Sequence, residues 1–201
     1  DYAALGRRAR APRRNCPDCA RPITFDGSYP RQVREAGVVH TIFVRRARCS
    51  SCGTSHALLP DFILRGRLDS TATVGAVILA RVGIVMPPGI ERLSVGVPVR
   101  TVTSWHRRFA ERAPELVQRF DALCVEWGAT LPFPPPSHAT PTHHVACSIG
   151  EVWRAARRHR DSDLPPAWRL ANVIVGSQLL ATRVDLPWPI RTSMIGVSHS
   201  P

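Results

Sequence analysis

Two pairs of cysteines constrain the fold of this 201-residue chain more than any other feature. Cys16 and Cys19 form one CxxC pair, Cys49 and Cys52 form a second, and 29 residues separate the pairs. A CxxC turn aims two thiolates at one point about 2.3 Å from a Zn²⁺ ion, and a second such turn completes the tetrahedral coordination that zinc accepts. The spacing predicts one structural Zn²⁺ ion held by four cysteines.

The segment between the pairs has the pattern of a small β-sheet. Ile23 to Phe25 is apolar and β-prone, and Val38 to Ala47 has the composition of a long strand. Asp26-Gly27 and Glu35 to Gly37 are turn signals, which we expect to return the chain to its start. We therefore predict a zinc ribbon over residues 14–60.

Other uses of these cysteines are less favoured. A redox-active CxxC is expected as one pair beside a βαβ pattern, and structural disulfides need an oxidising compartment. His40 or His56 in place of a cysteine ligand is a further alternative, although with a complete Cys₄ set we expect both histidines on the surface or beside the ligands. Because the protein fills all four positions, no ligand position is left open for a catalytic water.

The charge of the chain favours a polyanionic partner. Formal net charge is +12 and the pI is about 11.1, and all 27 basic residues are arginine. Residues 1–67 carry 13 arginines against 5 acidic residues, so the cysteine end is also the most basic. Within it, Arg45, Arg46 and Arg48 either contact phosphate or offset the formal charge of −2 on a Cys₄ zinc site.

After Pro60 the hydrophobic pattern becomes helical. Asp69 or Ser70 is expected to cap a helix that runs through Val74, Val77, Ile78 and Val82 and is stopped by Met86-Pro87-Pro88-Gly89. Gly96 is then expected at the turn between two short helices. In the second of these, Val102, Trp105 and Phe109 form one apolar stripe.

The remaining faces of that second helix suit a DNA-reading element. Hydroxyls near a helix N-terminus contact phosphate, and arginines a turn later read guanine or clamp the backbone. The first helix fits less well, because Glu91 and Arg92 stand where such units usually have an apolar and a small residue. An ordinary core helix with a solvated basic face is the alternative. The predicted contact residues are Arg100, Thr101, Thr103, Ser104, Arg107 and Arg108.

Several of these motifs together resemble a known family. The motifs are CPDC from Cys16, the Tyr29-x-Arg31 hairpin, VRRARC from Val44, CGTSHALLP from Cys52 and TVTSWHRRFAERA from Thr101. In this order they resemble an actinobacterial family with a zinc ribbon and a helix-turn-helix, encoded near mobile elements. The N-terminal part is also similar to the zinc ribbon of ISL3-type transposases.

The resemblance covers roughly residues 14–113, with a weaker echo at Pro165 to Asn172. It implies DNA binding by the ribbon and the helix-turn-helix together. One departure is Ala20, since such ribbons usually have glycine after the second cysteine.

The flanking segments carry weaker signals. Residues 1–13 are expected to form a basic arm, 61–130 a helix-turn-helix domain, 131–144 a proline-rich linker and 145–201 a C-terminal helical segment. We expect Leu116 to Trp127 to continue as an amphipathic helix, and Pro165 to Ala181 to form a last, buried helix. Ile149 to Arg160 is expected to be helical, with arginines that either meet phosphate or face solvent. Cys124 and Cys147 are expected to be buried thiols, and a second metal near Thr142 to His144 is less favoured.

We predict an α+β protein that binds and does not catalyse. No succession of strands after residue 60 is expected to bring three carboxylates together, and P-loop, GxSxG and HExxH motifs are missing. The predicted function is double-stranded DNA recognition, as an accessory factor of a mobile element or a transcription regulator, with homodimerisation. The alternative is an adapter that docks a transposase or ATPase partner and binds DNA by charge alone. We expect no membrane span and a bacterial cytoplasmic location, and the first residue, Asp1, suggests that an upstream piece is missing.

Overall fold

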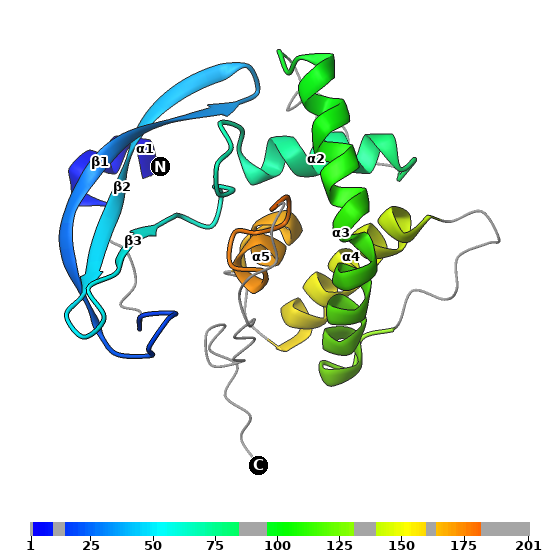
Figure 1. Ribbon diagram of the computed structural model, residues 1–201. Helices are drawn as coiled ribbons and strands as arrows, with labels where there is room; N and C mark the ends of the chain where they lie inside the picture. The colour runs from blue at the N-terminus through cyan, green and yellow to red at the C-terminus, as the bar shows by residue number, and fades with distance from the viewer. Residues whose placement is uncertain (1, 10–14, 85–95, 131–139, 160–163, 182–201) are drawn as a thin grey trace.

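The computed structural model describes residues 2–9, 15–84, 96–130, 140–159 and 164–181. It places a three-stranded antiparallel sheet beside a group of helices (Figure 1). The predicted α+β class is confirmed. The elements in order are α1 (Tyr2–Leu5), the 3₁₀ turn η1 (Gly6–Arg8), β1 (Ile23–Glu35), β2 (Val38–Cys49), β3 (Ser55–Leu58), α2 (Thr71–Arg81), α3 (Val99–Glu126), α4 (Pro141–His159) and α5 (Ala167–Ile174).

The sheet is dominated by one long hairpin. β1 and β2 pair from Ile23 opposite Cys49 to Glu35 opposite Val38, and β3 adds to the cysteine end of β2. Ala36 and Gly37 both have positive φ, 48° and 80°, as a two-residue primed turn requires. The second predicted turn is therefore confirmed.

The first predicted turn is wrong. Asp26 and Gly27 lie inside β1, where the register shifts between Phe25, opposite Ala47, and Ser28, opposite Arg45. Two residues of β1 thus face Arg46 alone, which is a β-bulge. Gly27 has φ +91°, a conformation that glycine adopts without cost, so the Asp-Gly signal marks a bulge here instead of a chain reversal.

The helices share one apolar core. A single cluster of buried side chains includes members of α2, α3, α4 and α5, Leu64 from the loop before α2, and residues just after α5. The segments on both sides of residues 131–139 therefore contribute to the same core. The hairpin has a smaller cluster of its own, made by Val33, Ile42, Val44 and Ile63. None of the helices in the described residues is long and apolar enough to cross a bilayer.

The start of α2 agrees with one of the two caps predicted for it. The Ser70 hydroxyl accepts a hydrogen bond from the Thr73 backbone N–H at 3.2 Å, so Ser70 is the N-cap of α2. Asp69, the other predicted cap, instead pairs with Arg34. α2 ends at Arg81 and is followed by Gly83 at φ +75°. The Met86 to Gly89 stop lies outside the described residues.

α3 is a single helix of 28 residues, and it includes the predicted continuation from Leu116 as far as Glu126, with Trp127 as its C-cap. Trp105 and Phe109 are fully buried and Val102 packs partly against the same core, which confirms the predicted stripe. Gly96 precedes the helix at φ +76°. Because residues 85–95 lie outside the described part of the chain, the first helix of the expected helix-turn-helix is not described.

The last two helices differ in extent from their predictions. α4 begins at Pro141, so Thr142 to His144 are helical and not the end of a linker. The Thr140 hydroxyl accepts from the His143 N–H, which makes Thr140 the cap of a helix with proline at its first position. α5 ends at Ile174, and Gly176 and Ser177 then adopt positive φ, so the expected helix to Ala181 stops early.

Polar contacts of three side chains, Arg34, Arg169 and Asn172, fix the hairpin and its following loop to the helical part. Arg34 of β1 forms a two-point ion pair with Asp69 at 2.7 and 3.1 Å, and its other amino group reaches the Gly96 carbonyl. On the opposite side Arg169 of α5 forms a similar pair with Asp61, and Asn172 donates to the Asp61 and Ile63 carbonyls. The loop from Asp61 to Asp69 is thus held at both ends.

Candidate metal centre and a basic hollow

The four predicted ligands meet at one end of the hairpin. The sulfurs of Cys16, Cys19, Cys49 and Cys52 all lie within 4.8 Å of one another. Cys16 Sγ is 3.6 Å from Cys52 Sγ, and Cys19 Sγ is 3.5 Å from Cys49 Sγ. A tetrahedral Zn–S₄ site with bonds of about 2.3 Å has sulfurs about 3.8 Å apart, whereas a disulfide needs about 2.0 Å. The donor set and its spacing fit a zinc ion.

Both CxxC turns have the same backbone geometry. The N–H of the residue after the second cysteine bonds to the carbonyl of the first, from Ala20 to Cys16 at 2.8 Å and from Gly53 to Cys49 at 3.0 Å. The N–H of the first cysteine then bonds to the carbonyl five residues later in each turn. Ala20 and Gly53 both have positive φ, 59° and 73°. Ala20 therefore adopts the left-handed conformation that glycine usually provides at this position.

The surroundings of the thiols differ from one cysteine to another. The hydroxyl and backbone N–H of Thr54 lower the pKa of Cys52 to about 6. At Cys19 the Arg21 N–H favours the thiolate, but the neighbouring thiols, Cys49 foremost, and burial outweigh it and raise the pKa to about 12. Burial also raises the pKa of Cys16. Of these three thiols, the thiol of Cys52 therefore loses its proton most readily when no metal is bound.

The two histidines occupy different places. His56 Nε2 lies 3.2 Å from Cys16 Sγ, so His56 contacts a ligand and stands beside the Cys₄ set. This agrees with the predicted place of His56. His40 pairs with Val33 nine residues along β2 from Cys49, about 30 Å away at the usual rise per residue. His40 is therefore not an alternative ligand.

The three basic residues of β2 are engaged to different degrees. Arg45 donates to the carbonyls of Ala9 at 3.0 Å and Arg7 at 2.8 Å, and so holds the N-terminal segment on the sheet. Arg46 pairs with Asp26 across the bulge at 3.3 Å, with both side chains about half exposed. Arg48 donates to the Gly53 carbonyl of the second CxxC turn and is exposed. Arg46 and Arg48 remain accessible to a partner, whereas Arg45 is used internally.

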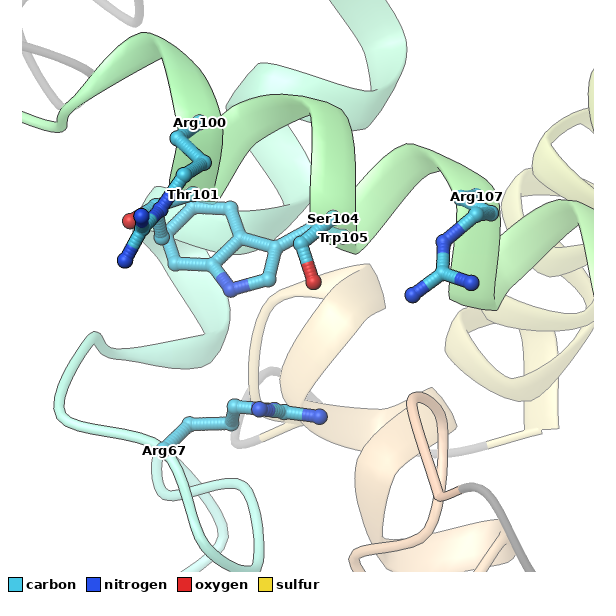
Figure 2. A pocket seen from close by; sticks show the side chains of 6 residues that line it. All are labelled: Arg67, Arg100, Thr101, Ser104, Trp105 and Arg107. Carbon is cyan, nitrogen blue, oxygen red and sulfur yellow. The ribbon is translucent and has the colours of Figure 1, made fainter.

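A second feature, a hollow of about 410 Å³, lies at the start of α3 (Figure 2). Four of the six DNA-contact residues predicted on this helix line it, and Thr103 and Arg108 do not. Sequence analysis missed Arg67, which enters from the loop before α2 and faces α3 across the hollow. An arginine in a loop has no periodic signal to mark it. The lining residues are Arg67, Arg100, Thr101, Ser104, Trp105 and Arg107.

The remaining candidates lie apart from these two features. Cys124 is buried, which raises its pKa to about 11, while Cys147 is half-buried with its sulfur 3.8 Å from His143 Nδ1. In the described part of the chain no third ligand joins that pair. His144 instead bonds to Asp121 of α3 at 2.9 Å. The arginines of α4 are exposed: Arg157 lies over the Trp153 ring, and Arg158 donates to the Gly128 carbonyl at 3.3 Å.

The family comparison matches the ribbon and α2. Residues 16–82 match the model of a family described as a domain of unknown function, DUF6431. This third of the chain contains all four clustered cysteines and Arg67, and ends before α3. No curated protein and no solved structure matches the chain. What these findings define is a small antiparallel sheet with a cysteine cluster compatible with a zinc ribbon, joined to a helical core.

Proposed function

We propose that this chain is a zinc-stabilised protein that binds double-stranded DNA through the first turns of α3. The observation that carries the proposal is the division of that helix into two faces. Trp105 and Phe109 anchor one face in the core, and Arg100, Thr103 and Arg107 are exposed on the other. The first turn has no acidic residue. A rigidly held helix that offers arginine and hydroxyl groups suits the DNA major groove.

The zinc ion has a structural role in this proposal. Four thiolates would hold it, and it would fix the CxxC turn that precedes β1 to the CxxC turn that follows β2. Arg46 and Arg48, exposed beside this site, add positive charge that favours the phosphate backbone. The proposal assigns the chain binding and no catalysis.

The resemblance to ribbons of ISL3-type transposases favours the ends of a mobile element as the DNA target, with an operator as the other choice. A transposase or ATPase partner and a homodimer extend the same proposal. The competing function is an adapter whose DNA affinity is only electrostatic. The two differ in sequence discrimination, because bulk charge gives affinity without specificity.

Selection of bound fragments from a randomised duplex pool tests the proposal. The zinc-loaded full chain is incubated at about 150 mM salt, where charges beyond about 8 Å are screened, with excess competitor DNA. We expect one enriched motif, which the double variant Arg100→Ala, Arg107→Ala loses. The matched control is Arg154→Ala, Arg157→Ala, which removes the same charge from exposed positions of α4. Binding without enrichment favours the adapter, and no binding by folded protein refutes both.

A further inference from the structure

Arg67 has an unusual environment for an arginine in a loop. Its backbone is fixed, since the carbonyl accepts from Arg31 at 2.6 Å and the N–H donates to the Leu64 carbonyl at 3.2 Å. One amino group reaches the Leu180 carbonyl at 3.3 Å. The Nε atom is buried and has no hydrogen-bond partner among the described residues. A buried donor without a partner is costly, so this side chain has donor capacity that the described residues leave unused.

The hollow into which Arg67 points is lined by donors. Three guanidinium groups have five N–H donors each and no acceptor. The hydroxyls of Thr101 and Ser104 add two more groups, and Ser104 Oγ already accepts from Arg108 Nε at 3.4 Å, so its own proton is free for another acceptor. Figure 2 shows the indole nitrogen of Trp105 on the side that faces Arg67. None of the six lining residues is acidic. This lining suits an anion with several oxygens.

Positive charge is also crowded here. Burial lowers the pKa of Arg67, and the positive charge of Arg108 lowers it further. The nearby carboxylate of Glu111 is 3.6 Å from Arg107, in a pair whose side chains are both more than half exposed. Among the described residues neither Arg67 nor Arg100 forms an ion pair with a carboxylate, so a bound anion would offset positive charge that the protein leaves uncompensated.

The position of the hollow points to the source of that anion. Arg100 and Arg107 belong both to the hollow and to the exposed face of α3 that we assign to DNA. A phosphate of a duplex lying on this face would reach the hollow without entering the core. The volume of about 410 Å³ accommodates a phosphodiester together with water.

We propose that Arg67, together with Arg100 and Arg107, forms an anchor for one backbone phosphate of the bound DNA. The proposal rests on the proposed function and adds a contact from outside α3. A phosphate clamped between the loop and the helix fixes the register of α3 on the duplex, while base contacts supply specificity.

The first test compares Arg67→Gln with Arg65→Gln. Both remove one positive charge from the same loop, but Arg65 is exposed and does not line the hollow. We expect Arg67→Gln to weaken DNA binding roughly tenfold for all sequences, and to reduce the salt slope by about 0.9, the value for one phosphate contact. Arg65→Gln should change affinity much less. Equal losses in the two variants would show that only bulk charge matters and would overturn the anchor.

A second test keeps the wild-type protein and changes the DNA. Duplexes in which one phosphate at a time is replaced by an uncharged methylphosphonate are titrated with wild type and with Arg67→Gln. We expect one position that weakens wild type but leaves the variant unaffected. If every position affects both proteins equally, Arg67 contacts no particular phosphate and the proposal fails. If Arg100→Ala and Arg107→Ala also leave the affinity for DNA unchanged, the proposed function itself is refuted.

Inorganic phosphate distinguishes a free anion from a DNA phosphate. At constant ionic strength, phosphate should raise the thermal midpoint of wild type slightly and that of Arg67→Gln not at all. If phosphate stabilises wild type through Arg67 while DNA affinity ignores Arg67, the hollow is a site for a free anion, and its assignment to DNA is wrong.

Discussion

The indole ring of Trp168 in α5 lies directly over the backbone of Gly75 in α2. A methyl group at Gly75 would stand 2.6 Å from Cδ1 and Cδ2 of that ring, far inside contact distance. Trp168 also packs against Phe109 of α3, with ring centroids 5.7 Å apart. Gly75 thus allows three helices to meet, and its lack of a side chain has a packing purpose.

We expect Gly75→Ala to destabilise the protein by about 1–2 kcal/mol. Overpacking costs about 1–3 kcal/mol, and the better helix propensity of alanine returns up to about 1 kcal/mol. The control is Gly150→Ala in α4, where the nearest atom to a new methyl is 4.0 Å away, so only the propensity gain of about 0.5–1 kcal/mol remains. Urea denaturation of both variants measures the difference. If both variants change the free energy of unfolding in the same direction, the close contact between Trp168 and Gly75 is contradicted.

Zinc binding should depend steeply on pH. Because the pKa values of Cys16 and Cys19 are raised in the metal-free cluster, both thiols are protonated at neutral pH and must lose their protons to bind zinc. Acid therefore weakens binding, by at least about a hundredfold per pH unit near neutrality for two displaced protons. Below pH 6 protonation of Cys52 adds to the loss. Competition with a chromogenic chelator at several pH values measures this.

The stoichiometry provides the control for zinc binding. Elemental analysis of the purified protein should give one zinc per chain, which Cys49→Ser should lose and Cys147→Ser should keep, since Cys147 lies outside the cluster. Retention of zinc by Cys49→Ser would show that the four thiols are not the ligand set.

The two CxxC turns should respond to substitution with opposite signs. Ala20→Gly relieves a left-handed alanine that costs about 1–2 kcal/mol, against about 0.5–1 kcal/mol of added backbone entropy in the unfolded chain. We expect a net gain of roughly 0.5–1 kcal/mol. Gly53→Ala should lose about 1 kcal/mol, because the site is open and only the backbone resists. Thermal unfolding of the zinc-loaded variants is the measurement, and a loss in both would mean that the turns are not equivalent.

The junction between hairpin and helices should depend on Asp69. This carboxylate is only 3% exposed, and Asp69→Asn would leave the Arg34 guanidinium without its charge partner at a cost of about 2 kcal/mol. Asp26→Asn is the matched control, since it breaks the exposed Arg46 pair and should cost under about 0.5 kcal/mol. Equal effects in chemical denaturation would show that the Arg34 pair is no more sheltered than a surface pair.

Local rules in the sequence predicted part of this fold well. The Cys₄ cluster, the primed turn at Ala36-Gly37 and the Ser70 cap each depend on a few neighbouring residues whose chemistry has one dominant use. Local rules also mark the start of α4. Thr140 followed by Pro141 is a cap and a first helical residue, so the start of α4 was readable.

Other features depend on distant partners and had no local signal. Asp26-Gly27 forms a bulge because the β1–β2 pairing continues on both sides of it, and pairing is a property of two strands. Arg67 belongs to the hollow because Arg31 and Leu180, far away in sequence, fix its position. Gly75 is required by Trp168, 93 positions later in the numbering. The roles of such residues depend on partners far away in sequence, so they become visible only in the folded structure.

The hairpin has consequences for how the protein would come apart. Its cysteine end and its turn are separated by 12 residues of β2, about 40 Å. Among the described residues, Arg34 and Glu35 near the turn fasten the hairpin to Asp69 and Ser70 at the start of α2. Loss of a bound metal would therefore act on the distant end first. Amide exchange should accelerate around the CxxC turns while Val33 and the helical core stay protected. Local unfolding would then begin at the cysteine end of the hairpin and leave its turn end folded.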